Sequence, residues 1–176
     1  DPVAIRELAT QAAKLGKRKD SIKLWQRLLE LSPKDATCYI NLSSNFCKLR
    51  QYHEARRAAR KAVKFAPKLK EGHLNLGLSE FHLGHFKKAE NIFSQLAREH
   101  GDHYSIVFLL GASQICQGKT EIGIKTTHSL RNTNIWENLS YAIQDLVEGL
   151  SASGWHRAAR NLIDGAESLN CTNDRI

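Results

Sequence analysis

Apolar residues recur along the chain with the spacing of helix faces. In the segment 36–48, Tyr39, Leu42 and Phe46 lie three and four residues apart, so they share one face of a helix. The segment 52–65 carries alanines at the same kind of spacing. Arg50-Gln51 separates the two segments, and Pro67 follows the second, where a proline ends a helix. The pattern therefore predicts a helical hairpin over residues 36–69.

The same pattern returns at intervals of 34 residues. Columns at this interval hold a leucine, a turn residue and a small residue: Leu8, Leu42, Leu76, Leu110; Gly16, Arg50, Gly84, Gly118; Ser21, Ala55, Ala89, Gly123. After a slip of two residues, a further unit repeats the internal spacing with Leu146, Gly154, Ala159 and Ala166. We infer five hairpin repeats, at about 2–35, 36–69, 70–103, 104–137 and 140–173. We expect the leucine, alanine and phenylalanine columns to form the core, and the turn column to adopt a left-handed conformation.

These columns resemble the tetratricopeptide repeat, whose signature is W-x2-L-G-x2-Y, then A-x3-F, then P. The third unit is the most similar, with Leu76-Gly77, Gly84, Phe86, Ala89 and Phe93. The fourth and fifth units depart from the signature in the aromatic slot, which holds Thr127 and Ile163. The resemblance implies an all-α fold of helical hairpins stacked into a right-handed superhelical solenoid. It also implies that the first helices line a concave groove, and we expect a single domain over residues 1–176.

Family resemblance places the fifth, sixth, ninth and twelfth positions of each first helix among those that line the groove. In the middle units these positions are mostly apolar, with two asparagines, and the predicted groove residues are Ile40, Asn41, Leu74, Asn75, Leu78, Phe81 and Phe108. A contiguous apolar surface marks an interaction site, so we expect the groove to hold a peptide or a partner helix. The two asparagine side chains could pair with a ligand's backbone or with a neighbouring helix. The carboxylate clamp of chaperone-binding members is not matched, because Thr10, Glu71 and Asn75 occupy three of its positions.

Charge is concentrated in the first two units. The chain has 26 Lys and Arg against 18 Asp and Glu, a net charge of +8. Residues 14–70 hold a net charge of +12, and the remainder holds −4. The second helices predict a basic convex patch made of Lys23, Arg27, Arg56, Arg57, Arg60, Lys61 and Lys64. The patch is interpreted either as a solvated helix face or as a docking surface for an acidic protein or an anionic membrane. Self-association through the charge asymmetry is a further possibility, and nucleic acid ranks last because stacking aromatics are missing beyond Tyr52.

Motifs of catalysis are missing from the sequence. It has no GxxxxGK[ST], GxGxxG, GxSxG or HExxH motif. Four cysteines, Cys38, Cys47, Cys116 and Cys171, lack the spacing of zinc ligands, and four histidines of the third unit are interpreted as surface or turn residues: His82, His85, His100 and His103. We expect no cofactor and no metal.

The function that we predict is a non-enzymatic protein–protein interaction scaffold in the cytoplasm. One alternative is a self-assembling or surface-recruited adaptor that uses the basic convex patch. A second is the repeat portion of a larger enzyme or of a secretion or envelope assembly protein. The chain begins Asp1-Pro2 without a methionine, which indicates a truncated or processed N-terminus. No apolar run reaches the length of a membrane span.

Overall fold

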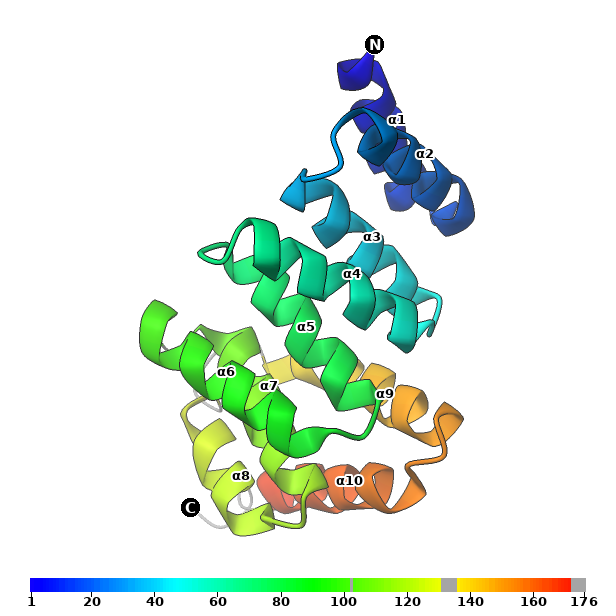
Figure 1. Ribbon diagram of the computed structural model, residues 1–176. Coiled ribbons are helices and arrows are strands. Elements are labelled where there is room, and N and C mark those ends of the chain that lie inside the picture. Colours follow the sequence, from blue (N-terminus) through cyan, green and yellow to red (C-terminus); the bar gives the residue numbers. More distant parts are fainter. Residues whose placement is uncertain (102, 131–135, 172–176) are drawn as a thin grey trace. The chain divides into compact units, whose positions relative to one another are not determined.

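The computed structural model describes residues 1–101, 103–130 and 136–171, and the regular structure in these ranges is helical (Figure 1). The helices are α1 (Pro2–Lys14), α2 (Arg18–Leu31), α3 (Ala36–Lys48), α4 (Tyr52–Phe65), α5 (Lys70–His82), α6 (Phe86–His100), α7 (Tyr104–Cys116), α8 (Thr120–Thr127), the 3-10 helix η1 (His128–Leu130), α9 (Trp136–Ala152) and α10 (His156–Cys171). They pair into helical hairpins, which confirms the all-α repeat fold. The last hairpin begins at Trp136, within the predicted fourth unit of 104–137. The chain divides into two compact units, Asp1–Ser79 and Glu80–Ile176. The expectation of a single domain stays a prediction.

Each hairpin turns at a residue in the left-handed region. The φ angles are 74° at Gly16, 77° at Gly84, 83° at Gly118 and 82° at Gly154. Arg50 adopts a φ of 58° in the same column, although a side chain disfavours this conformation. The agreement across the column confirms the predicted turn conformation, including the one turn that lacks a glycine.

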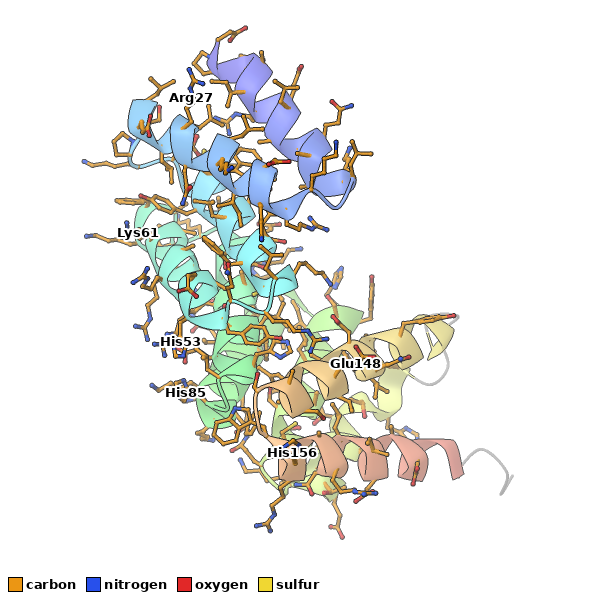
Figure 2. The ribbon with its side chains drawn as sticks, turned by 90° about the vertical axis from the view of Figure 1, so that its right-hand side faces the viewer. Arg27, His53, Lys61, His85, Glu148 and His156 are labelled. Carbon is orange, nitrogen blue, oxygen red and sulfur yellow. The ribbon has the colours of Figure 1, made fainter. Side chains whose placement is uncertain are left out.

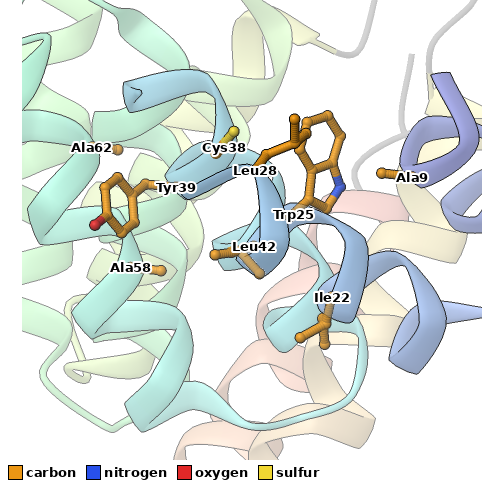
Figure 3. Packing of buried hydrophobic residues seen from close by; sticks show 9 residues of the cluster. All are labelled: Ala9, Ile22, Trp25, Leu28, Cys38, Tyr39, Leu42, Ala58 and Ala62. Carbon is orange, nitrogen blue, oxygen red and sulfur yellow. The ribbon is translucent and has the colours of Figure 1, made fainter. Parts of the chain in front are cut away.

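The core of the first unit forms where α1, α2, α3 and α4 meet. Figure 3 shows the Trp25 indole on the Ala9 side of this cluster and the Tyr39 ring on the side of Ala58 and Ala62. Small residues let α1 and α2 approach each other closely. The buried Ser21 hydroxyl on α2 donates to the Ala9 carbonyl oxygen on α1 at 2.8 Å. The leucine column is less uniform, because Leu8 is 54% exposed. The prediction of a core role for Leu8 is wrong, since it lies at the flank of the stripe that α1 buries against α2.

The core of the second unit is centred on α7. This helix packs against α6, α8 and α10, and every residue from Ile106 to Cys116 except Leu110 is buried. Its sequence carries the apolar run Ile106–Leu110, and a helix that is apolar on all sides is normally an interior helix. The enclosure of α7 is therefore encoded in its own residues.

The last hairpin, α9 and α10, contacts the fourth hairpin through α10, which packs against both α7 and α8 (Figure 1). In the earlier hairpins, the contact runs from a second helix to the next first helix, as between α2 and α3 and between α6 and α7. The Cys116 Sγ lies 3.7 Å from the Ala158 carbonyl oxygen, and a Cβ on Gly165 would lie 3.0 Å from Ile115. Thus α10 lies directly on α7.

Trp155, in the turn before α10, packs on the turn between α5 and α6. Its ring centroid lies 5.9 Å from that of Phe86, with an interplanar angle of 75°. A Cβ added to Gly84 would overlap the Trp155 ring. The last hairpin therefore reaches the turn of the third repeat as well as the helices of the fourth.

Candidate partner-binding surfaces

The predicted groove residues of the first unit lie on α3 and on α5 up to Ser79. Five of them are half-buried, which leaves part of each side chain accessible: Ile40, Asn41, Leu74, Asn75 and Leu78. Asn75 Nδ2 donates to the Ile40 carbonyl oxygen at 3.0 Å, so the groove positions of α3 and α5 are adjacent. We refer to these five residues as the unit 1 groove face.

The two asparagine amides of this face are engaged within the chain. Asn41 Nδ2 donates to the Thr37 carbonyl oxygen at 2.9 Å, one turn back on α3. Asn75 Nδ2 donates across to α3, as described above. The sequence allowed pairing with a ligand or with a neighbouring helix, and the structure shows the second for Asn75. Each amide keeps its carbonyl Oδ1 and a second N–H for a ligand, because one of its two N–H donors is used within the chain.

Phe81 and Phe108 differ from this face. Phe81 is fully buried, and its ring packs edge-to-face on Phe86 with centroids 5.3 Å apart. Phe108 is 7% exposed, because the helices of the second unit enclose α7. Both rings belong to the core, contrary to the expectation that they line an open groove.

An ion pair joins a groove position of α1 to the start of α3. Arg6 Nη2 lies 2.8 Å from Asp35 Oδ2, while Asp35 Oδ1 accepts from the Thr37 and Cys38 amides and caps the helix. Burial acts to raise the pKa of Asp35, but the Arg6 guanidinium and the Cys38 amide outweigh it and hold the pKa below its ordinary value. Asp35 therefore remains a carboxylate that fixes the N-terminus of α3 beside α1.

The residues predicted to form the basic convex patch lie on α2 and α4. Lys23, Arg27, Arg57, Arg60, Lys61 and Lys64 are exposed, and Arg56 is half-buried. Figure 2 shows Arg27 and Lys61 extending to the same side of the first unit. This arrangement is consistent with the expectation that the basic residues of α2 and α4 form one patch. Whether a partner uses the patch stays a prediction.

A pocket of about 460 Å³ lies between α2 and α4, and sequence reasoning did not find it. Its lining residues come from three helices: Gln26, Leu29, Tyr39, Leu42, Phe46, Glu54, Arg57, Ala58 and Lys61. We refer to it as the α2–α4 pocket. The Lys61 Nζ lies 5.2 Å from the centroid of the Tyr39 ring, within range of a cation–π interaction. The sequence identified the basic residues around the pocket, but whether a pocket forms depends on how α2, α3 and α4 pack together.

The described cysteines are free thiols without the features of a reactive site. Burial raises the pKa of Cys38 to about 12 and that of Cys116 to about 12, and it also raises the pKa of Cys47. A thiol that stays protonated is a poor nucleophile and a poor metal ligand. In the part of the chain that the structure describes, no three His, Cys, Asp or Glu residues are grouped to hold a metal ion. None of the described helices is long and apolar enough to span a membrane.

Comparison with known proteins identifies the fold. No protein-family model matches the sequence, and no curated protein matches it either. Solved structures do match, among them MamA 41-end from Desulfovibrio magneticus RS-1, at 15% identity and a TM-score of 0.71, over 98% of this chain and 97% of that one. YrrB, described as a TPR protein with an unusual peptide-binding site, is 15% identical with a TM-score of 0.67, over 96% of this chain and 86% of that one.

A third match is the first TPR of Spaghetti (RPAP3), which was solved bound to an HSP90 peptide. It is 14% identical with a TM-score of 0.64, over 66% of this chain and 93% of that one. Identities at this level establish the fold alone. The chain thus has the fold of the tetratricopeptide-repeat proteins, as its repeat columns predict.

Proposed function

We propose that this chain is a protein-interaction scaffold without catalytic activity, and that its unit 1 groove face holds an extended peptide or a partner helix. The observation that carries the proposal is the half-burial of Ile40, Leu74 and Leu78 on adjacent helices. A surface that keeps a contiguous apolar set accessible gains free energy when a partner covers it. Two proteins of the same fold support a peptide ligand, since Spaghetti was solved with one and YrrB is described as having a peptide-binding site.

The groove face also limits the chemistry of the ligand. Its apolar side chains favour a segment with aliphatic or aromatic residues, and the Oδ1 atoms of Asn41 and Asn75 can accept hydrogen bonds from backbone amides. Glu71, at the start of α5, disfavours a C-terminal carboxylate at this end of the face. An internal segment therefore fits better than an acidic C-terminus.

Selection of peptides from a displayed random library, followed by affinity measurement, tests this function. We expect Ile40→Glu combined with Leu78→Glu to weaken the selected peptides about tenfold or more, because each change places a charge against apolar ligand atoms. Leu15→Glu combined with Leu31→Glu is the matched control, since both leucines are exposed and lie outside the face. Equal binding to both variants, or the absence of any selected peptide, would contradict the proposal.

A further inference from the structure

The α2–α4 pocket and the unit 1 groove face lie on opposite sides of α3. Tyr39, Leu42 and Phe46 line the pocket, whereas Ile40 and Asn41 belong to the groove face. A helix advances by about 100° per residue, so these two sets fall on roughly opposite faces of the same helix. A ligand in the pocket would therefore not compete for space with a ligand in the groove.

The interior of the pocket is apolar and its rim is basic. Leu29, Leu42 and Phe46 supply aliphatic and aromatic surface from α2 and α3. Arg57 and Lys61, one turn apart on α4, supply two cations, and Glu54 supplies one carboxylate. The side chains that line the pocket therefore carry a net positive charge around an apolar floor.

The surroundings of the pocket extend the positive charge. Lys23 and Arg27 are exposed on α2, and Arg60 and Lys64 are exposed on α4. Charges of one sign on both sides of a cleft raise the local concentration of an oppositely charged partner and speed its association. The ligand should therefore carry an apolar group that fills the pocket and acidic groups on either side of it.

We propose that the α2–α4 pocket binds an acidic segment of a partner protein that inserts one large aliphatic or aromatic side chain, with carboxylates on either side. The apolar group would cover Leu29 and Phe46, and the carboxylates would pair with Arg57 and Lys61. This proposal rests on the interaction role of the scaffold but not on the use of the groove face. It implies that the basic convex patch contacts a ligand and is not only a solvated helix face.

The shape of the site favours a protein segment over a lipid surface or a nucleic acid. Binding in a membrane interface requires apolar groups that project into the lipid, whereas here the apolar groups are recessed between two helices. Binding of single-stranded nucleic acid relies on exposed aromatic faces. Tyr39 is buried and is covered by Lys61, so it does not offer such a face.

A fluorescent peptide with one leucine between runs of Asp and Glu provides the probe, and its anisotropy is measured with the whole chain. We expect Arg57→Glu combined with Lys61→Glu to weaken binding about tenfold or more. Lys34→Glu combined with Lys68→Glu makes the same change in net charge at exposed turn residues outside the pocket, and should weaken binding less than about threefold. Replacing the leucine of the probe with serine should weaken binding about tenfold.

Three results would overturn the proposal. Equal losses in the two charge variants would show attraction to net charge alone. Equal binding of the serine peptide would show that the apolar floor is not used. Binding to phosphatidylserine–phosphatidylcholine vesicles without binding to the peptide would assign the patch to a membrane.

Two further variants separate this site from the groove face. Glu54→Gln removes the carboxylate of the lining, and should raise affinity for the acidic peptide about twofold. Ile40→Glu combined with Leu78→Glu adds two negative charges outside the pocket, and should weaken acidic-peptide binding less than about threefold. A loss of about tenfold in the groove variant, with its circular dichroism and melting temperature unchanged, would contradict the separation of the sites.

Discussion

The helices α3 and α7 are the first helices of the second and fourth hairpins, yet they are packed differently. At the fifth and sixth repeat positions, α3 carries Ile40 and Asn41 half-buried, whereas α7 carries Phe108 and Leu109 buried. In the second unit, α7 packs against α6, α8 and α10, whereas α3 packs mainly against α2 and α4. One repeat pattern can therefore build either a helix that presents a surface or a helix that is mostly buried.

The largest expected effect comes from truncating the equivalent side chains of these two helices. Phe108→Ala should lower the free energy of unfolding by about 3–5 kcal/mol, because it leaves a cavity among the packed helices of the second unit. Ile40→Ala should cost about 1 kcal/mol, because part of the side chain is already in contact with water. Denaturant unfolding measured by circular dichroism checks both values. Equal costs would show that the two helices are equally enclosed.

A smaller effect should follow from the contact between Trp155 and Gly84. Gly84→Ala adds a methyl group that overlaps the Trp155 ring and also strains a φ of 77°. We expect a loss of about 2–3 kcal/mol and faster alkylation of Cys116, which lies against Ala158 at the start of α10. Peptide-level mass spectrometry of the labelled protein measures the alkylation rate.

Gly118→Ala is the matched control for this contact. Its φ is 83°, but nothing lies within 4 Å of the added Cβ. It should therefore cost only the conformational strain, about 1 kcal/mol, and leave Cys116 protected. Faster alkylation of Cys116 in both variants would mean that the Trp155 contact does not hold α10 in place.

The smallest effect concerns acid pH and a carboxylate of the second unit. Glu90 is 13% exposed, and its Oε2 lies 3.0 Å from Lys119 Nζ. Burial acts to raise the pKa of Glu90, but hydrogen bonds from Gln117, Lys119 and Lys87 outweigh it and lower the pKa to about 2. A carboxyl whose folded pKa is depressed stabilises the fold above its unfolded value of 4.5 and loses this contribution as the pH falls toward 2.

Glu90→Gln should therefore cost about 1–2 kcal/mol at neutral pH, and the cost should fall away as the pH drops below its folded pKa of about 2. Melting temperatures of the variant and the original chain, measured between neutral and acid pH, should converge on acidification. Asp35→Asn gives the corresponding test for the first unit, where the pKa is also lowered. A constant difference across the pH range would contradict the role of the Glu90 carboxylate.

The helices, turns and close crossings could be predicted from the sequence, because helical periodicity, turn residues and small residues all indicate the same hairpins. The turn column was identifiable because glycine fits a left-handed φ, and its spacing located Arg50 as the equivalent residue. The small-residue column predicted close crossings, which Ser21 and Ala55 confirm by being fully buried. These features depend on residues a few positions apart.

The surfaces could not be predicted as well, because they depend on contacts between distant hairpins. Phe81 and Phe108 occupy groove positions of the repeat, and only the packing of the second unit shows that they are buried. A signal was nevertheless available in the uninterrupted apolar run from Ile106 to Leu110. The α2–α4 pocket left no such signal, since its volume depends on the spacing of two helices.

The two faces of α3 have a thermodynamic consequence. Tyr39 and Leu42 belong at once to the core and to the wall of the pocket, while Asn75 on α5 is bonded to the α3 main chain at Ile40. A ligand that restrains α3 from one face reduces the conformational entropy that a second ligand must remove on the other. Linkage requires that each ligand then change the other's affinity by the same factor. If both sites bind ligands as proposed, this helix of 13 residues would couple two partners that never touch.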